Sequence, residues 1–312
     1  MRTLEPVIRP LDPHAPHFNL ATHDGKFHAD EIMAIAILTP LFQGMAVYRT
    51  RSTEILKTMD LCVDIGGGPF DHHQKGHQHY RGNGMPLASA GLVWAAYGER
   101  YVAKLLKDCC IKLSEQAIRE IALDVDRLLV EPVDAQDCGV VHPGRHCLNY
   151  VGSFNSSWLR GDETNDFQQA VHLACLIFRK EVMAIIARAA ARDVVVDQLR
   201  QLPEGERILI LEKFVPWIDT VQKMDPEERV QLVVFQDMTG TWRVQTIPKT
   251  GEERFVNRLT LPEAWRGVTQ AELALLTGVE DAMFCHPSGF IAGAATREGV
   301  VAMAYQALLA NC

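Results

Sequence analysis

The amino-acid sequence predicts an α/β fold in which an N-terminal, doubly wound and mostly parallel sheet is followed by a second, smaller α+β domain. Three observations support this prediction. Short apolar segments alternate with helical patterns in the first half, a loop-like stretch divides the chain near its middle, and short β-type segments prevail in the second half. A chain of 312 residues is long enough for two domains, which we expect at 1–160 and 161–312.

The first half is predicted to alternate between strands and helices. We expect strands at residues 18–22, 46–49 and 61–63, and helices at residues 30–42, 52–59, 88–107 and 114–130. Strands that are joined through helices form parallel sheets. In such sheets the functional residues collect in the loops at the carboxyl ends of the strands. These loops are therefore the first place to look for a site.

The second half begins after a boundary that we place within residues 150–166, which are rich in Gly, Ser and Asn. A long helical pattern over residues 166–202 follows, with apolar residues three and four positions apart. The later β-type segments comprise residues 207–211, 230–236, 241–247, 282–285 and 290–292, and a last helix is expected at 296–309. We expect a largely antiparallel sheet here.

The composition limits the classes of function. With 47% hydrophobic and 22% charged residues, the chain has the composition of a globular protein. Its net charge of -8 argues against a large basic surface for duplex nucleic acid, although metals in an acidic site can still attract a phosphate. The eight cysteines include no CxxC pair, so neither a disulfide framework nor a thiolate zinc site is indicated.

The sequence gives no sign of a membrane or secretory protein. No apolar run approaches the roughly 20 residues that a transmembrane helix needs. The first residues contain acidic side chains and four prolines, which is unlike a signal or transit peptide. We therefore expect a cytoplasmic protein without a membrane partner, and a homodimer stays open.

Metal-type ligands stand at the ends of the predicted strands. The segment THDGKFHADE supplies His23, Asp24, His28, Asp30 and Glu31 after the first strand. Further candidates are Asp64, which precedes a triple glycine, the segment Phe70–Gln74, and the pair Asp134 and Asp137. Imidazole with carboxylate and without thiolate suits Mn²⁺, Mg²⁺, Fe²⁺ or Zn²⁺ in a hydrolytic site better than a structural zinc.

Each of these clusters has an ordinary interpretation when taken alone. A single His-x-Asp is commonly a surface feature, an Asp before His often caps a helix, and three glycines often form a turn. The prediction of a metal site rests on their common position, because ends of neighbouring strands converge on one rim of the sheet. Four further histidines, His77, His79, His142 and His146, are expected to be solvated or to support the site from outside.

These motifs resemble those of the DHH phosphoesterase superfamily, which is named for the tripeptide present here as Asp71-His72-His73. Within it, the sequence is most similar to the MYG-type exonucleases, also called melanocyte proliferating gene proteins. The matching segments are THDGKFHADE, VDIGGGPFDHHQ, SAGLVW, DAQDCG, LPEAWRG and FCHPSGFIAGAATREGVVAMA. They extend from about residue 19 to residue 309 and occur in the family's order.

The resemblance implies two divalent ions and a ligand set for each. Mn²⁺ is the expected metal, and Mg²⁺ is the alternative. The first ion would be held by His23, His28 and Asp64, and the second by Asp30, Asp64, His72 and one of Asp134 or Asp137. The expected catalytic residues are Asp71 and His73, with His73 facing the substrate phosphate. His28 stands where the pyrophosphatase-like pattern has Asp, and Cys138 stands where Asn is common. The second departure leaves the choice between Asp134 and Asp137 open.

The resemblance also implies a function and a division of labour. The first domain would hold the metals, and the second would hold the substrate through Arg258, Arg266, His286, Ser288, Gly289 and Gly293. The implied activity is 3′-to-5′ exonuclease action on RNA or short oligonucleotides. The alternative is a small-molecule phosphohydrolase acting on nucleotides or pyrophosphate. A non-catalytic metal-binding protein is the rival from another class.

Overall fold

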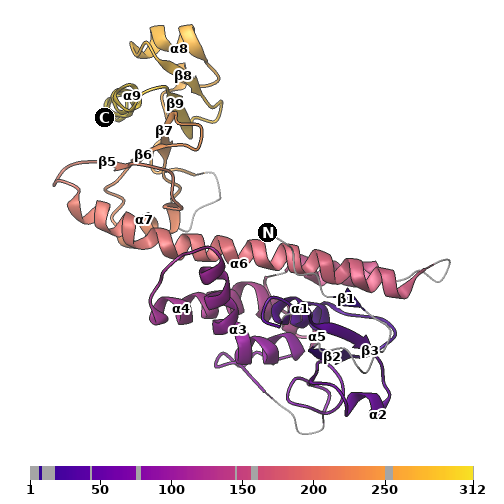
Figure 1. Cartoon of the computed structure of the whole chain (residues 1–312). Coiled ribbons are helices and arrows are strands. Elements are labelled where there is room, and N and C mark those ends of the chain that lie inside the picture. The colour runs from indigo at the N-terminus through magenta and orange to yellow at the C-terminus, as the bar shows by residue number, and fades with distance from the viewer. Residues whose placement is uncertain are drawn as a thin grey trace. The chain divides into compact units, whose positions relative to one another are not determined.

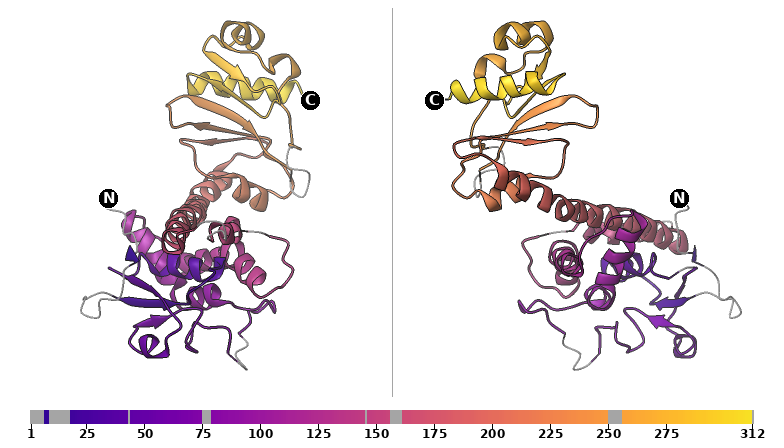
Figure 2. Two further views of the ribbon diagram at one scale, coloured as in Figure 1. Left: turned by 90° about the vertical axis from the view of Figure 1, so that its right-hand side faces the viewer. Right: turned by 60° about the vertical axis from the view of Figure 1, so that its left-hand side comes forward.

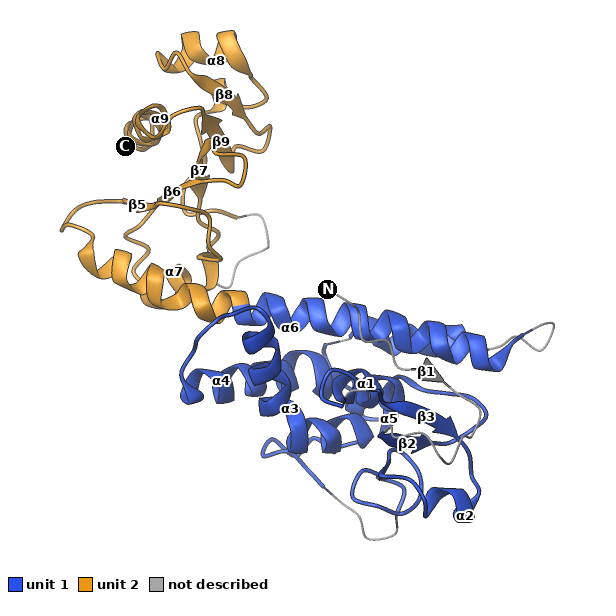
Figure 3. Cartoon of the chain, in the orientation of Figure 1, with its two compact units in different colours: residues 1–186 blue, residues 187–312 orange. Residues whose placement is uncertain are grey.

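The chain forms two compact units, residues 1–186 and 187–312 (Figure 3). The computed structural model describes residues 7–8, 18–42, 44–74, 79–144, 146–155, 161–249 and 256–311. The predicted class, a parallel α/β sheet followed by a separate α+β unit, is confirmed. The two units divide within helix α6 (Glu163–Gln201). The assignment of a catalytic domain to residues 1–160 and a substrate domain to residues 161–312 stays a prediction.

Unit 1 is built on a parallel sheet whose described strands follow the order β1-β3-β2-β4 (Figure 1). The strands are β1 (Val7–Ile8), β2 (Asn19–Thr22), β3 (Ala46–Arg49) and β4 (Leu61–Cys62). Strand β2 lies between β3 and β4, and its side chains from Leu20 onward are buried. The three strands expected from the sequence are present, and β1 adds an edge strand that the Pro-rich lead-in did not suggest.

Helix α1 (Ala29–Leu38) is buried along its whole length and packs against α3 (Ser89–Asp108). A helix that is apolar on all sides belongs inside a domain rather than on its surface. Its first turn nevertheless carries two carboxylates, Asp30 and Glu31, which are fully buried. Buried charges need partners, so the start of α1 imposes a polar site on the core.

The helical segment that follows α3 is longer than the sequence predicts. Helix α4 (Glu115–Val125) continues through a π-helical turn (Asp126–Val130) into α5 (Glu131–Asp137). The helical pattern of the sequence predicts an end at residue 130. Pro132 follows the π-helical turn after one residue, Glu131, whose N–H bonds to the carbonyl of Asp126, so the regular hydrogen-bond ladder is already interrupted where the proline lacks an N–H. The DAQDCG motif therefore lies at the end of a helix rather than in a loop.

The remaining described elements of unit 1 are short. Helix α2 (Thr53–Leu56) leads from β3 toward β4, and a 3₁₀ helix (Cys147–Phe154) precedes α6. The first part of α6 packs into the core of unit 1 through apolar side chains such as Phe167 and Phe178. None of the helices in the described ranges is both long and apolar enough to cross a bilayer.

Unit 2 contains a mixed sheet whose described strands follow the order β5-β6-β7-β9-β8. They are β5 (Ile208–Leu211), β6 (Leu232–Gln236), β7 (Trp242–Thr246), β8 (Ala282–Cys285) and β9 (Ile291–Ala294). The β5–β6 pair is parallel and the other pairs are antiparallel, as the prediction of a largely antiparallel sheet requires.

The sheet of unit 2 has a separate apolar core on each face. Helix α9 (Arg297–Leu309) lies along one face and covers residues such as Val234 and Val244 (Figure 2). On the other face, Val195 of α6 and Trp217 pack against Val233. Two further short helices, α7 (Ile218–Met224) and α8 (Gln270–Thr277), and a 3₁₀ turn (Glu263–Trp265) were not expected from the sequence.

Arg258 has a structural role in unit 2 in place of the expected substrate contact. Its side chain is 1% exposed, and its guanidinium donates to Asp225 Oδ2 at 2.6 Å and to the carbonyl of Val230 at 2.8 Å. Asp225 in turn accepts the backbone N–H of Arg229 and of Val230. Arg258 thus anchors the segment between α7 and β6.

We predict that Arg258→Ala destabilises unit 2 strongly, because it leaves the Asp225 carboxylate buried without its cation. The expected loss is about 3–5 kcal/mol of unfolding free energy. The matched control is Arg200→Ala, whose side chain is 72% exposed and 3.7 Å from Asp197. That change should cost less than about 1 kcal/mol. Urea unfolding followed by tryptophan fluorescence measures both, and equal losses would refute the structural role.

Candidate metal centre

The ligand candidates meet at the carboxyl ends of β2 and β4, which are adjacent parallel strands. His23 directly follows β2, and Asp64 follows β4 after one intervening residue. His28 is the residue that precedes the first turn of α1. The first two motifs of the sequence therefore converge at one edge of the sheet.

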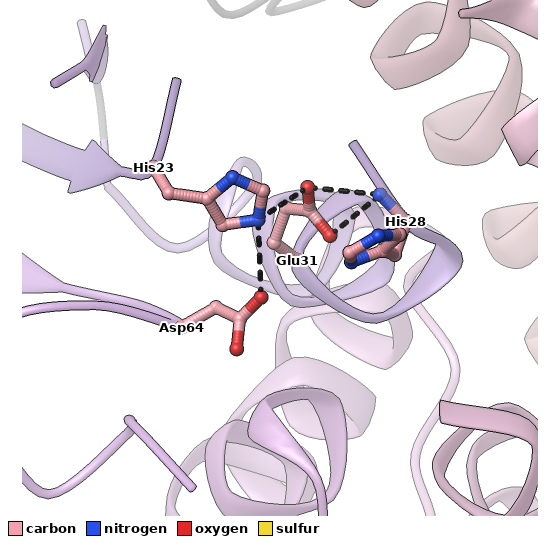
Figure 4. A group of neighbouring side chains, drawn as sticks. All are labelled: His23, His28, Glu31 and Asp64. Carbon is pink, nitrogen blue, oxygen red and sulfur yellow. Dashed lines mark hydrogen bonds and ion pairs between the residues drawn. The ribbon is translucent and has the colours of Figure 1, made fainter. Parts of the chain in front are cut away.

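One group of side chains contains His23, His28, Glu31 and Asp64, whose ligand atoms all lie within 4.8 Å of one another (Figure 4). His23 Nε2 is 3.1 Å from Glu31 Oε1 and 3.3 Å from Asp64 Oδ2. Both oxygens of Glu31 accept the backbone N–H of His28 at 2.9 Å. Glu31 was a candidate ligand in the THDGKFHADE motif but was not part of the ligand set that the family resemblance implies.

A second set of groups surrounds His72. The ligand atoms of Asp30, His72 and Asp137 lie within 4.8 Å of one another, as do those of Asp64, His72 and His73. His72 Nε2 is 3.1 Å from Asp137 Oδ2, and its Nδ1 is 3.3 Å from Asp64 Oδ1. Asp64 thus belongs both to the His23 group and to a His72 group, as a carboxylate that bridges two ions would.

The conformation of Asp64 depends on the glycines behind it. Asp64 has a φ of +61°, a left-handed conformation that costs a residue other than glycine about 1 kcal/mol. Gly66 and Gly67 follow with φ values of +88° and +68°. The loop then folds back, so that the N–H of Asp64 donates to the carbonyl of Phe70 at 2.9 Å. The triple glycine therefore serves to turn Asp64 and the DHH segment toward the same space.

The side chains of this centre fit divalent cations. Burial, and then the charges of Asp64 and Asp137, raise the pKa of Asp30 well above its ordinary value. Burial lowers the pKa of His23, but hydrogen bonds to Asp64 and Glu31 outweigh this effect and raise it to about 10. Among the described residues, the buried Asp64 Oδ2 accepts no hydrogen bond of good geometry. Imidazole and carboxylate donors crowded to this extent are a suitable set for a divalent cation.

Asp134 and Asp137 have different surroundings. Asp137 lies beside His72, whereas the fully buried Asp134 accepts a hydrogen bond from Arg81 Nη2 at 2.7 Å and from the Gly91 N–H at 3.0 Å. Arg81 also binds Asp126. Asp134 is not a member of the ligand groups within the described residues, and Arg81 is its ionic partner instead. The geometry favours Asp137 as the ligand.

The N-terminus of α3 is capped by carboxylates from other parts of the chain. Asp30 accepts the backbone N–H of Ser89 at 2.9 Å and of Ala90 at 2.6 Å, and Asp134 accepts that of Gly91. These N–H groups have no partner inside the helix. An added Cβ at Gly91 would lie only 2.9 Å from Asp134 Cγ, so no larger residue fits. The SAGLVW motif thus supplies the donors that hold two acidic side chains in place.

Asp71 and His73, the two expected catalytic residues, lie in the same turn. Asp71 accepts the N–H of Gly67 at 2.8 Å and of His73 at 3.0 Å, and its Oδ1 is 3.2 Å from His73 Nδ1. Burial raises the pKa of Asp71, but the hydrogen bonds from Gly67 and His73 outweigh it and bring the pKa below its ordinary value. Asp71 is therefore an ionised carboxylate that orients His73, while the exposed His73 ring faces the cavity described next.

The centre opens into a cavity of about 690 Å³ in unit 1. His23, His28, Asp64 and His73 line it, together with the two cations Lys26 and Arg51. Arg51 Nε donates to Asp24 Oδ1 at 2.9 Å, which keeps the guanidinium close to the loop between His23 and His28, called the ligand loop below. Sequence reasoning missed both cations, because neither is a metal-ligand type, although Lys26 lies inside the first motif.

The loop between His23 and His28 is held by residues far along the chain. The side-chain amide of Asn155 accepts the N–H of Phe27 at 2.8 Å and donates to its carbonyl at 2.7 Å. Glu163 accepts the N–H of Gly25 and a hydrogen bond from Arg49, both at 3.0 Å. Asn155 and Glu163, which lie within the predicted domain boundary at residues 150–166, therefore hold the ligand loop in place.

Most of the expected substrate contacts of unit 2 surround one turn. His286 Nδ1 is 2.8 Å from Ser288 Oγ, and the carbonyl of His286 accepts the N–H of Gly289. An added Cβ at Gly289 would lie 2.7 Å from Arg266 Nε, which places Arg266 against the same turn. Gly293 lies apart on β9, beside Arg243 and Phe284.

The histidines expected outside the centre are mostly engaged elsewhere. His142 Nε2 is 3.2 Å from Glu131 Oε1. His79 is also engaged in a contact and is not free. His146 Nε2 is 2.5 Å from Glu181, in a group that also includes Cys147. His146 Nδ1 accepts the N–H of Leu148, so its Nε2 carries the proton and donates to Glu181. His77 lies outside the described residues.

An α/β unit that gathers imidazoles and carboxylates around a cavity at the ends of its strands defines a candidate metalloprotein. This chain belongs to the family described as MYG1_exonuc, uncharacterised protein family UPF0160, whose model matches residues 19–308.

Individual relatives agree with this membership. The chain is 32% identical to the MYG1 protein C27H6.8 of Caenorhabditis elegans, over 93% of this chain and 94% of that one. It is 29% identical to the MYG1 exonuclease of Homo sapiens, over 91% of this chain and 84% of the relative. A solved structure of RecJ in complex with Mn²⁺ from Thermus thermophilus aligns with 14% identity and a TM-score of 0.26, covering 93% of this chain and 52% of RecJ.

We predict that Asp137→Asn and Asp134→Asn separate metal binding from structure. Asp137→Asn should lower the amount of bound Mn²⁺ by about one ion per chain, because an amide is a weak ligand beside His72. Asp134→Asn should retain the wild-type amount of metal and lower the melting temperature, because it weakens the buried pair with Arg81. Elemental analysis after gel filtration and thermal unfolding give the two readouts, and the reverse pattern would assign the ligand to Asp134.

We predict that Gly91→Ala lowers both stability and metal affinity. Alanine in a helix is normally more stable than glycine by about 0.5–1 kcal/mol. Here the new methyl group must displace Asp134 and shift the start of α3, and overpacking of this kind costs about 1–3 kcal/mol. The shift would reach the metal centre because the N–H groups of Ser89 and Ala90 at the start of α3 hold the proposed ligand Asp30. Gly152→Ala is the control, because its added Cβ would meet no atom within 4 Å. Unchanged melting and Mn²⁺ titration curves for Gly91→Ala would contradict this account of the motif.

Proposed function

We propose that this protein is a divalent-metal-dependent phosphodiesterase that acts as a 3′-to-5′ exonuclease on RNA or short oligonucleotides. The observation that carries the proposal is the pair of ligand groups that share Asp64 beside a cavity lined by His73, Lys26 and Arg51. Membership of the family and the name of its human relative, MYG1 exonuclease, support the same reaction class.

The proposed ligands follow the geometry of the centre. One ion would be held by His23, His28 and Asp64, with Glu31 as a further ligand or as the group that orients His23. A second would be held by Asp30, Asp64, His72 and Asp137. When bound, such a pair of ions supplies Lewis-acid activation of water and stabilises the charge of the phosphoryl group.

The other residues of the cavity would bind and orient the substrate. Because His73 Nδ1 faces the carboxylates of Asp64 and Asp71, its Nε2 is the nitrogen available to a phosphoryl oxygen. Lys26 and Arg51 carry the positive charge that a phosphodiester needs next to so many acidic groups. Arg51 is held by Asp24, so less side-chain freedom is lost when it binds a phosphate.

The second candidate function is a small-molecule phosphohydrolase for nucleotides or pyrophosphate. It is favoured by the net charge of -8 and by a described cavity lining with only the two cations Lys26 and Arg51. Incubation with Mn²⁺ and 5′-labelled RNA, resolved to single nucleotides, separates the alternatives. A ladder of shortened RNA supports the exonuclease. Hydrolysis of a dinucleotide or pyrophosphate with the RNA intact supports the second candidate, and no turnover at all leaves a non-catalytic metal-binding protein.

We predict that His73→Ala and Arg51→Ala affect different kinetic constants. His73→Ala should lower kcat by about 10²-fold while bound metal stays near the wild-type amount, as expected of a group that acts on the reacting phosphate. Arg51→Ala should raise KM about tenfold or more, because a hydrogen bond to a charged group is lost.

Lys57→Ala is the control for Arg51→Ala, since Lys57 is exposed and outside the cavity lining. If the His73→Ala protein lost a metal ion, His73 would be a ligand, as its position beside Asp64 and His72 also allows.

A further inference from the structure

Unit 2 contains a cavity of about 380 Å³ that none of the sequence motifs accounts for. Its lining includes Arg188, Phe214, Trp217, Asp219 and Gln245, all of which belong to unit 2. We propose that this cavity binds a nucleobase of the substrate. The inference rests on the proposed function, because it names the part of a nucleotide that unit 2 would recognise.

Phe214 is the first reason for this proposal. Its side chain is 50% exposed, although a large aromatic ring is normally covered. The ring is nevertheless held in place, since it lies 5.2 Å from the ring of Phe235 and its backbone N–H donates to the carbonyl of Gln236 at 2.8 Å. A fixed, half-exposed ring on a cavity wall is a stacking surface for a flat aromatic ligand.

Gln245 is the second reason. It lies on β7 opposite Val233 of β6, on the sheet face whose core contains Trp217. Its side-chain amide is half-buried and has no hydrogen-bond partner among the residues that the structure describes. An amide places a donor and an acceptor side by side, which matches the edge of a base. An apolar ligand would leave that amide unsatisfied.

The charge of the lining is the third reason. Arg188 and Asp219 are the charged residues of the described lining, so the lining has no net charge. Arg188 Nε and Asp219 Oδ2 are 3.9 Å apart. A phosphate or another anion would meet the Asp219 carboxylate as well as the guanidinium. A neutral aromatic group avoids this repulsion, and the half-exposed guanidinium of Arg188 can lie flat against its face. The cavity therefore suits the base of a nucleotide better than its phosphate.

Binding of a short single-stranded RNA in EDTA tests the proposal without hydrolysis. Fluorescence anisotropy should show that the wild-type protein binds the RNA about fivefold or more tightly than an abasic strand of the same length. Phe214→Ala and Gln245→Leu should lose this preference, so that each variant binds both strands with the affinity that the wild-type protein has for the abasic strand. Phe214→Trp should restore the preference, which rules out a mere folding defect. Met238→Ala, a change at an exposed side chain outside the lining, should bind like the wild type.

A direct map of the contact comes from RNA that carries 5-bromouracil. Ultraviolet crosslinking followed by peptide mass spectrometry should label the segment that contains Phe214 and Trp217. Labelling confined to other peptides, or equal affinity of the wild type for normal and abasic strands, would overturn the proposal even if the protein hydrolyses RNA.

Two further outcomes separate this proposal from the others. Preference for bases without any phosphoester hydrolysis would leave the base site standing and refute the proposed function. If sedimentation showed a wild-type dimer that Phe214→Ala converts to a monomer, the cavity would be an interface between copies of the chain, and the base-site proposal would be wrong.

Discussion

The dominant constraint on unit 1 is a concentration of negative charge inside its core. Asp30, Asp64, Asp134 and Glu31 are all buried near the first turn of α1. A buried carboxylate without partners costs several kcal/mol, so each must be compensated by a hydrogen bond or a cation. Asp134 has Arg81, Glu31 has the N–H of His28, and Asp30 has the N–H groups at the start of α3. Asp64 accepts a hydrogen bond from Ser89 Oγ at 3.2 Å and lies 3.2–3.3 Å from ring nitrogens of His23, His72 and His73. Imidazoles and a hydroxyl therefore surround its charge in place of an arginine or a helix N-terminus, which is an environment that a divalent cation would complete.

The same constraint explains why helix packing and the site cannot be separated. Helix α3 has no side-chain cap of its own, and Asp30 and Asp134 provide the cap. Unit 2 has a related arrangement at α9, where Thr296 accepts the N–H of Gly299 as a side-chain cap and Asp281 accepts the N–H and the hydroxyl of Thr296. An added Cβ at Gly299 would lie 2.9 Å from Asp281 Cγ. In both helices the third residue is a glycine because an acidic side chain from elsewhere occupies the space a larger residue would fill.

The local sequence pattern was sufficient to predict the strands and the longer helices, and the predicted strand ends were sufficient to locate the candidate metal centre. The pattern could not predict which of two residues of the same type belongs to the site. Arg51 lines the cavity of unit 1 and pairs with Asp24, which lies 27 residues away in the sequence. Arg258 is buried in unit 2 and pairs with Asp225, which lies 33 residues away. The place of each arginine thus depends on a partner that is distant in the sequence. The preference for Asp137 over Asp134 likewise depends on Arg81, which lies outside the motif. The continuation of α4 into α5 was not predicted, because it passes through a π-helical turn and Pro132, neither of which belongs to a regular helical pattern.

The physical difference between the two cavities has a consequence for how a nucleotide is bound. Contacts of a phosphate with Lys26, Arg51 and bound cations are electrostatic, and salt screens them at exposed sites. Stacking on Phe214 and hydrogen bonding to Gln245 involve a neutral group and a lining without net charge, so they depend little on ionic strength. Raising the salt concentration should therefore weaken binding of normal and abasic strands by a similar factor, which leaves the preference for bases unchanged. A preference that disappeared with salt would mean that the bases are recognised through charge and not through this cavity.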